Sequence, residues 1–321
     1  MFDIIDKRMQ SIQKLFLASI FCLVTPMLAA QPLPVVASFS ILADMVREVG
    51  GPHVEVTSLV GPNTDSHVFN PTPADAKRIA SARLVFVNGL GFEGWLDRLV
   101  KASGYRGPIV IASKGVKTPL QLKDAHDHAG ASKGHGHQHS YGAPDPHAWQ
   151  NLANAERYVE TIRIALAAAL PAHSAVFERR ATDYNKRIRA LDQATKAQIA
   201  TVPAERRRVI TSHDAFGYFA AAYGVTFYPL QGLATGSEPT AAEVVRVIDL
   251  IKKNKVSAIF TENISDPRVL ERIAKDSGAT VGGRLYADAL TEPGTAADTY
   301  LKMFELNVAT IIKGMSGKAS P

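Results

Sequence analysis

The chain has 321 residues, of which 46% are hydrophobic and 21% are charged, a composition typical of a soluble globular protein. This length allows a large buried core and suggests two domains. The formal net charge is +6, but the basic residues form only short clusters without interleaved aromatic residues. Composition therefore gives no support for a nucleic-acid partner, and we expect none.

The first 30 residues have the pattern of a secretory signal peptide. Three basic side chains precede an apolar run at residues 15–24, and the small residues Ala29 and Ala30 follow it. The run is too short to span a membrane as a helix. We therefore expect export, with cleavage after Ala30.

The only cysteine, Cys22, lies inside this apolar run and is preceded by the bulky Phe21. A lipoprotein signal needs a small residue at that preceding position, so we expect no lipid anchor. The exported chain would then contain no cysteine, which excludes disulfide bonds and thiolate ligands.

Residues 31–172 alternate between apolar, strand-like runs and helical segments. Strands are predicted at residues 33–38, 54–60, 84–87 and 109–112, and helices at residues 41–49, 92–103 and 151–170. A further helix is predicted to begin at Pro73, because Thr72 is a good N-cap residue and Asp75 lies in the first turn. This order indicates an N-terminal α/β lobe.

A long helix is predicted at residues 174–199, within a linker of residues 173–200. It contains no glycine and no internal proline. At ~1.5 Å per residue it would span about 39 Å, roughly the width of a domain. Such a helix can connect two lobes stiffly; the alternative is a long surface helix.

Residues 201–321 repeat the alternation. Strands are predicted at residues 208–211, 225–228, 258–261 and 280–282, and helices at residues 215–223, 240–253, 267–277 and 299–313. Alternation on both sides of the long helix predicts an α/β protein with two lobes. Each lobe is expected to be a mainly parallel sheet flanked by helices.

Six of the ten histidines lie between residues 124 and 149. Five of them stand among Gly, Ala, Ser and Lys residues: His126, His128, His135, His137 and His139. This segment buries too little apolar surface to offset its ordering entropy, so residues 124–140 are predicted to form a mobile loop. Neutral imidazole suits zinc, copper and nickel, which makes the loop a candidate metal-binding tract. The alternative is a polar linker with incidental histidines.

Four polar residues, two from each half of the chain, fall in loops where two lobes could face each other: His67, His147, His213 and Asp288. Open α/β sheets present ligands at the carboxyl ends of their strands. Three imidazoles and one carboxylate make a four-coordinate set suited to zinc, whereas manganese is expected to have more oxygen ligands. The pattern thus predicts a zinc site. The remaining histidines, His53 and His173, do not fit it and are interpreted as surface residues.

Several other acids lie close to these candidates. Glu262 ends the strand at residues 258–261 and is either an alternative ligand or an acceptor for an imidazole N–H. Asp65, Asp145 and Asp214 each lie within two residues of a candidate ligand. We interpret these three as residues that form turns or orient an imidazole.

Four strings, in this order after the signal peptide, resemble the zinc/manganese solute-binding proteins of bacterial ABC importers: GPNTDSHVFNPTPADAKRI, DPHAWQN, TSHDAFGYFAAAYGV and LYADAL. The resemblance covers essentially all of residues 33–314. It implies two α/β lobes joined by one rigid helix, with the metal held between them by His67, His147, His213 and Asp288. It also implies delivery to an inner-membrane permease that a cytoplasmic ATPase drives.

Two features are similar to the zinc branch of this family. Manganese binders tend to have glutamate at the third ligand position, where this chain has His213, and zinc-specific members have a histidine-rich loop before the DPH string. One departure is Ser66, which stands where some zinc members have an acid. The departure favours Asp288 as the fourth ligand over a loop carboxylate.

The sequence therefore favours a periplasmic, monomeric protein that captures Zn(II) and delivers it to a membrane permease, with a periplasmic zinc donor as a candidate second partner. The alternative is a zinc buffer or metallochaperone that acts mainly through the histidine-rich loop. A secreted zinc hydrolase with Glu262 as general base is a third option, but the chain has no HExxH motif. A closed site with four protein ligands leaves no position for an activated water, so we expect no enzyme activity.

Overall fold

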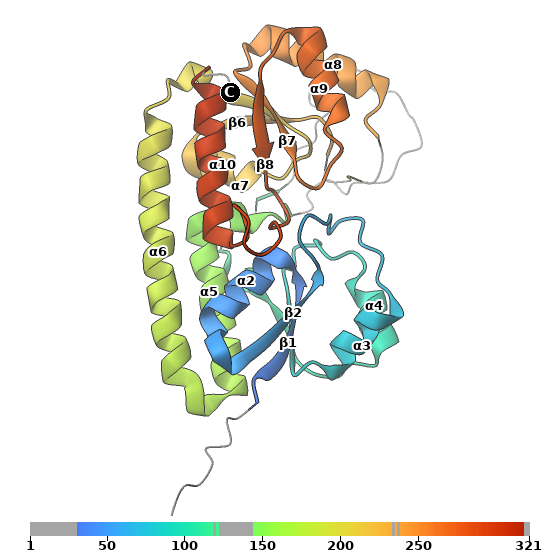
Figure 1. The fold of residues 1–321 in the computed structure, drawn as a ribbon, viewed down its shortest axis with the longest axis vertical. Coiled ribbons are helices and arrows are strands. Elements are labelled where there is room, and N and C mark those ends of the chain that lie inside the picture. The colour runs from blue at the N-terminus through green and yellow to red at the C-terminus, as the bar shows by residue number, and fades with distance from the viewer. Residues whose placement is uncertain (1–30, 118–119, 122–143, 233–234, 236–237, 318–321) are drawn as a thin grey trace, which may run out of the picture. The chain divides into compact units, whose positions relative to one another are not determined.

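The computed structural model describes residues 31–117, 120–121, 144–232, 235 and 238–317. The predicted signal peptide and the histidine-rich loop, with His126, His128, His135, His137 and His139, lie outside the described residues. Leu33–Pro321 forms one unit, and two four-stranded sheets make up its framework (Figure 1).

The first sheet is parallel throughout and has the strand order β2-β1-β3-β4. Its strands are β1 (Leu33–Phe39), β2 (Val54–Val60), β3 (Leu84–Val87) and β4 (Ile109–Ile111). Its helices are α2 (Ser40–Gly50), α3 (Pro73–Ser81), α4 (Leu96–Ser103) and α5 (Leu152–Ala169). The central strands read as continuous apolar runs because helices cover both faces of a parallel sheet. Accordingly, all four residues of β3 are buried.

The second sheet has the same topology, with strand order β6-β5-β7-β8, and is also parallel. Its strands are β5 (Arg208–Thr211), β6 (Thr226–Pro229), β7 (Ala258–Glu262) and β8 (Val281–Leu285). Its helices are α7 (Gly217–Tyr223), α8 (Ala241–Asn254), α9 (Arg268–Ser277) and α10 (Tyr300–Met315). The predicted fold class, two lobes that each contain a parallel sheet flanked by helices, is confirmed.

The predicted long helix is also confirmed as α6 (Ser174–Ala200), which has 27 residues. Its buried face includes Phe177, Tyr184 and Ile188, which recur at the spacing of a helical stripe. This face packs against α5 and α2 in the first lobe and against α10 in the second, so α6 runs alongside both lobes (Figure 1). One continuous apolar core extends through these helices, whereas α8 and α9 cover a smaller, separate core.

Two predicted element boundaries differ from the structure by three residues or more. The helix predicted from residue 92 begins at Leu96, because Gly89, Leu90 and Gly91 all have positive φ and form a turn before it. The Glu93 carboxylate stabilises that turn by accepting hydrogen bonds from the backbone N–H groups of residues 88 and 89. The strand predicted at residues 280–282 extends to Leu285.

The helix start predicted at Pro73 is confirmed in atomic detail. The Thr72 hydroxyl accepts a hydrogen bond from the backbone N–H of Asp75, and the Asp75 carboxylate accepts one from the backbone N–H of Thr72 at 2.8 Å. This capping box fixes the end of the loop that contains His67.

His53 and His173 are not simple surface residues. Both are partly buried, and their rings stack with centroids 4.0 Å apart. Both rings also contact Phe177, so they belong to the contact between the first lobe and the start of α6.

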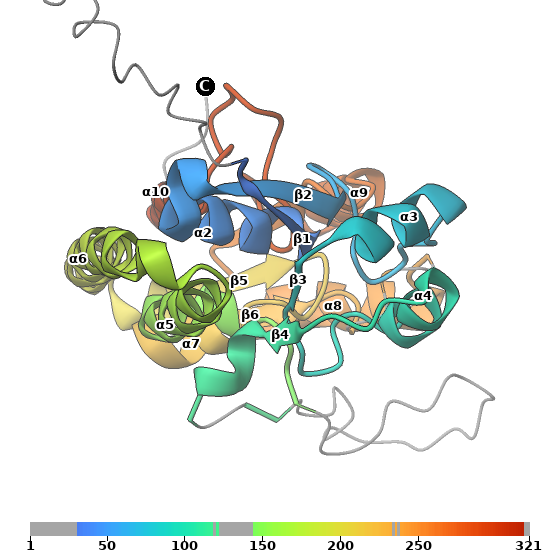
Figure 2. The same cartoon turned by 90° about the horizontal axis from the view of Figure 1, so that it is seen from below.

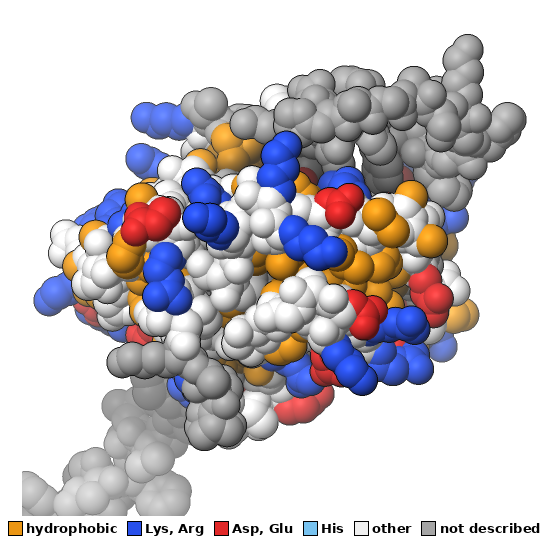
Figure 3. Space-filling view, turned by 90° about the horizontal axis from the view of Figure 1, so that it is seen from above, with side chains coloured by type: hydrophobic (Ala, Val, Ile, Leu, Met, Phe, Trp, Pro, Cys, Tyr) orange, Lys and Arg blue, Asp and Glu red, His pale blue; other side chains and the backbone are white. Residues whose placement is uncertain are grey.

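Charged side chains are spread over the surface. On the face shown in Figure 3, Lys and Arg side chains lie among acidic, apolar and uncharged ones, without forming one continuous basic stripe. No helix within the described residues is long and apolar enough to cross a membrane.

Candidate metal centre

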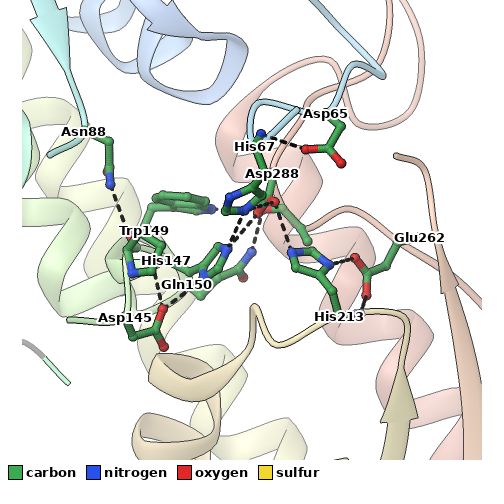
Figure 4. Close-up of polar contacts among 12 residues, drawn as sticks. Asp65, His67, Asn88, Asp145, His147, Trp149, Gln150, His213, Glu262 and Asp288 are labelled. Atoms are coloured by element: carbon green, nitrogen blue, oxygen red, sulfur yellow. Dashed lines mark hydrogen bonds and ion pairs between the residues drawn. The ribbon is translucent and has the colours of Figure 1, made fainter. Parts of the chain in front are cut away.

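The four candidate ligands from the sequence meet at one point between the two sheets (Figure 4). One donor atom from each of His67, His147, His213 and Asp288 lies within 4.8 Å of the others. The side chains of His147 and Asp288 have no exposed surface and that of His213 is 1% exposed, whereas that of His67 is 12% exposed. The cluster is therefore almost sealed from water, except beside His67.

The spacing of the donor atoms matches a small, tetrahedral ion. His67 Nε2 lies 3.3 Å from His147 Nε2 and 3.2 Å from Asp288 Oδ2. His213 Nε2 lies 3.1 Å from Asp288 Oδ2, and His147 Nε2 lies 3.5 Å from Asp288 Oδ1. Ligands placed tetrahedrally at zinc bond lengths are about 3.3 Å apart. These four separations are close to this value, and the full set of donor atoms lies within 4.8 Å, so the cluster has the dimensions of a site for a small ion.

The fold explains why these residues converge. His67 lies in the loop after β2, His213 follows β5 by two residues, and Asp288 follows β8 by three. His147 precedes a short 3-10 turn (Ala148–Gln150) that leads into α5. The carboxyl ends of both sheets face this point, which is where open α/β sheets bind ligands.

Two carboxylates orient two of the imidazoles. Glu262 Oε2 lies 2.5 Å from His213 Nδ1, and Asp145 Oδ1 lies 2.8 Å from His147 Nδ1. When Nδ1 carries the proton and donates it to a carboxylate, the lone pair on Nε2 faces the cluster. From the sequence, Glu262 was either an alternative ligand or an acceptor for an imidazole N–H. In the structure its carboxylate lies at Nδ1 of His213, the position of an acceptor. Asp145 has the orienting position that we expected.

Asp65 has a different position. Its carboxylate accepts the backbone N–H of His67 at 2.8 Å, as expected for a turn-forming residue. Asp214 is mostly buried beside the cluster, and burial raises the pKa of its carboxyl. Within the described residues, Asp214 forms no hydrogen bond to any of the four candidate ligands.

Trp149 and Gln150 form hydrogen bonds beside the cluster that the sequence did not indicate. The indole Nε1–H of Trp149 donates to the carbonyl of Ala287 at 3.0 Å, and the amide of Gln150 donates to the same oxygen at 2.8 Å. These bonds join the turn after His147 to the residue before Asp288, and so connect the two lobes beside the cluster. In the sequence, these two residues stand out only because they closely follow His147. That position does not reveal that Gln150 bonds to Ala287, which lies 137 residues away.

Charges within the cluster shift its pKa values strongly. Burial acts to lower the pKa of His147, but the carboxylates of Asp288 and Asp145 outweigh it and raise that pKa to about 9. Burial opposes protonation of His213 as well, and Glu262 and Asp288 still hold its pKa well above the ordinary value. Burial acts to raise the pKa of Asp288, yet His147 and His213 hold it well below its usual range. Three buried carboxylates thus stabilise positive charge here, and a metal cation must displace protons to bind.

The same geometry argues against hydrolysis. Glu262 Oε1 accepts the backbone N–H groups of Ser212 and His213, while its other oxygen contacts the imidazole. Its carboxylate is thus fully engaged and cannot act as a free general base. Four convergent donors also leave no open coordination position for a substrate water.

The fold and the cluster together define a class of protein: a two-lobed binding protein that can hold a metal ion between its lobes. Residues 35–314 match the family described as the periplasmic component A of the zinc-uptake complex. The chain belongs to this family. It is the metal-binding component of an ABC-type metal importer and is not an enzyme.

Several curated proteins are similar over most of their length. The manganese-binding lipoprotein MntA of Bacillus subtilis is 32% identical over 292 residues, which cover 89% of this chain and 91% of that protein. The iron-binding protein YfeA of Yersinia pestis is 32% identical over 285 residues, covering 89% and 87%. Because relatives such as MntA are named lipoproteins, the absence of a lipid anchor stays a prediction for this chain.

Solved structures share the fold. The periplasmic zinc-binding protein TroA from Treponema pallidum superposes with a TM-score of 0.79 at 28% identity, covering 89% of this chain and 99% of TroA. A manganese-bound periplasmic metal-binding protein from Candidatus Liberibacter asiaticus gives a TM-score of 0.74 at 28% identity, covering 88% and 98%. The named metals of these relatives are manganese, iron and zinc, so family membership alone does not define the metal of this chain.

Proposed function

We propose that this chain captures Zn(II) between its two lobes and delivers it to the membrane permease of an ABC importer. The observation that carries the proposal is the set of three imidazoles and one carboxylate, largely buried, whose donor atoms all lie within 4.8 Å of one another. In this proposal His67, His147, His213 and Asp288 are the ligands. Glu262 and Asp145 orient the imidazoles and balance the charge of the ion.

The choice of zinc rests on the ratio of nitrogen to oxygen donors. Three imidazoles suit zinc, whereas manganese favours carboxylate and carbonyl oxygens. His213 supplies nitrogen where a carboxylate would add oxygen. Glu262, the nearest further carboxylate, points to the far side of the His213 ring (Figure 4).

One observation favours manganese as the second candidate. Asp288 Oδ1 is buried and has no hydrogen-bond partner among the described residues. If both carboxylate oxygens bound the ion, the site would have five donors, two of them oxygen. That set is closer to what manganese prefers.

We propose that the chain acts as a monomer, and that the histidine-rich loop collects zinc from the surroundings or from a periplasmic donor. Weak sites close to a strong one raise the local metal concentration without adding contacts at the strong site. Deletion of residues 124–140 should therefore slow acquisition at limiting zinc and leave the affinity of the interlobe site unchanged.

Competition titration tests the proposed metal. Metal-free exported protein is titrated with chelator-buffered zinc and, separately, with chelator-buffered manganese. We expect one zinc per interlobe site and much weaker manganese binding. Tighter binding of manganese would contradict the zinc proposal and favour five-donor coordination with both oxygens of Asp288.

A further inference from the structure

The exposed edge of the metal cluster lies beside His67. The other three candidate ligands have side chains that are at most 1% exposed, so an ion reaches or leaves the cluster past His67. The next residue, Val68, is 52% exposed, although it is apolar. This position therefore combines the most exposed edge of the cluster with an exposed apolar side chain.

A groove continues from the same loop. It lies between α3 and α4, has a volume of about 650 Å³, and begins at Asn70. Its walls are more apolar than polar, and they include Ala76, Trp95 and Leu99. Figure 2 shows α3 and α4 side by side, away from α5 and α6. We call this feature the α3–α4 groove.

The charges around the α3–α4 groove all have one sign. Lys77 and Arg98 line it, and no acidic residue does. Both side chains belong to exposed residues, and neither has a carboxylate within 4 Å among the described residues. An apolar groove with two unpaired cations is complementary to an apolar segment that has acidic flanks.

Trp95 links the groove to the metal cluster. Its indole Nε1–H donates to the carbonyl of Ser66 at 3.0 Å, and its ring packs edge-to-face on Phe69 with centroids 5.0 Å apart. Trp95 therefore holds residues on both sides of His67. A segment that enters the groove and displaces Trp95 would release the most exposed of the four candidate ligands.

We propose that the α3–α4 groove receives an extracytoplasmic loop of the importer's membrane subunit, with an apolar tip and acidic flanks, and that docking loosens His67 through Trp95. The proposal rests on the proposed function, because it assumes that the ion leaves this cluster for a membrane permease. The occupant follows from the position of the groove beside the exit and from its charge.

The first test is a double charge reversal, Lys77→Glu with Arg98→Glu, in the full chain. Metal affinity and thermal stability should stay at the wild-type values, because both residues are exposed and form no ion pair. In cells where this chain is the sole binding protein of its importer, we measure the initial uptake of radiolabelled zinc. Uptake should fall about tenfold or more, since favourable charge steering raises association rates by about 10- to 1,000-fold.

The matched control is Arg179→Glu with Lys186→Glu on α6. These are also one arginine and one lysine, exposed on a helix and without an ion pair among the described residues. Figure 2 places α6 on the side of the molecule away from α3 and α4. The net charge changes by the same amount in the control and in the groove variant. If the control takes up zinc at the wild-type rate, the reduced uptake of the groove variant is due to the position of its charges at the groove.

A second variant tests the apolar part of the groove. Ala80 and Ala102 are exposed helix residues that line it, so Ala80→Gln with Ala102→Gln adds neutral bulk without disturbing the core. We expect normal metal affinity and reduced uptake here too.

Three outcomes would overturn the docking proposal. The first is wild-type uptake from both groove variants, and the second is an equal loss in the α6 control. The third is a dimer in sedimentation that the groove reversal dissociates, because the occupant would then be a second copy of this chain. If the wild-type chain held no tight metal at all, the proposed function itself would fail, so the two failures are distinguishable.

Discussion

The two sides of the metal cluster are held in different ways. On one side, His147 and His213 are buried, and each has a carboxylate within hydrogen-bonding distance of Nδ1. On the other side, the carboxylate of Asp65 accepts only the backbone N–H of His67, whose ring is partly exposed. Two imidazoles are thus oriented by carboxylates, whereas among the described residues no carboxylate lies at Nδ1 of the third. This difference suggests that affinity depends mainly on the buried side and that exchange of the ion occurs at His67.

The largest effect is expected when a buried imidazole is removed. Binding of zinc by four ligands is worth roughly 10–16 kcal/mol, so one ligand accounts for about 3 kcal/mol, or about a hundredfold in Kd. His213→Ala should lose more than His67→Ala, because it also leaves the buried carboxylate of Glu262 without its partner. Chelator competition measures both. Equal losses of zinc affinity in the two variants would contradict the proposed difference between the buried and the exposed side of the cluster.

A smaller effect is expected from Glu262→Gln. Removal of a carboxylate that orients a metal-bound histidine weakens binding by about 10- to 100-fold. Asp65→Asn is the matched change on the exposed side, and it should have little effect because an amide oxygen can still accept the backbone N–H of His67. If the two variants bound zinc equally well, the orienting role of Glu262 would be excluded.

The pH dependence should extend into the alkaline range. The pKa of His147 without metal is raised to about 9, so below that pH its imidazole carries a proton that zinc must displace. Affinity should therefore fall by about tenfold per pH unit for each displaced proton as the pH drops below 9. An imidazole with the ordinary pKa of ~6.5 would instead weaken zinc binding only at lower pH. Titration from pH 10 to 6 distinguishes these cases, because a flat affinity between pH 9 and 7 would contradict the raised pKa.

The smallest effect is expected from Thr240→Ala, which removes the capping box at the start of α8. The free energy of unfolding should decrease by about 1 kcal/mol, as is typical for loss of an N-cap side chain. Metal affinity should not change, since α8 provides none of the candidate ligands. Urea denaturation of the metal-free protein and a zinc titration measure the two quantities, and a weaker zinc affinity would show that α8 supports the site.

Local patterns in the sequence were enough for much of the fold. The Thr72 capping box, the buried run of β3 and the uninterrupted stretch that forms α6 each depend on neighbouring residues. The strand-end rule also brought out His67, His213 and Asp288, because the ends of parallel strands converge whatever the distance along the chain.

The interactions that position the cluster depend on contacts that no local pattern contains. Trp149 and Gln150 donate to the carbonyl of Ala287, and Trp95 donates to that of Ser66. A backbone carbonyl leaves no trace in the sequence, so these partners could not be predicted. Glu93, which was misplaced in a helix, likewise accepts a hydrogen bond from Ser38, 55 residues away.

The most direct test of the account is the metal content of exported protein that lacks residues 124–140, measured by native mass spectrometry beside its His213→Ala variant. The account predicts one tightly held zinc in the parent protein and a clearly lower zinc content in the variant. A parent that retained no zinc would contradict the interlobe site and would favour a zinc buffer or metallochaperone acting through the histidine-rich loop.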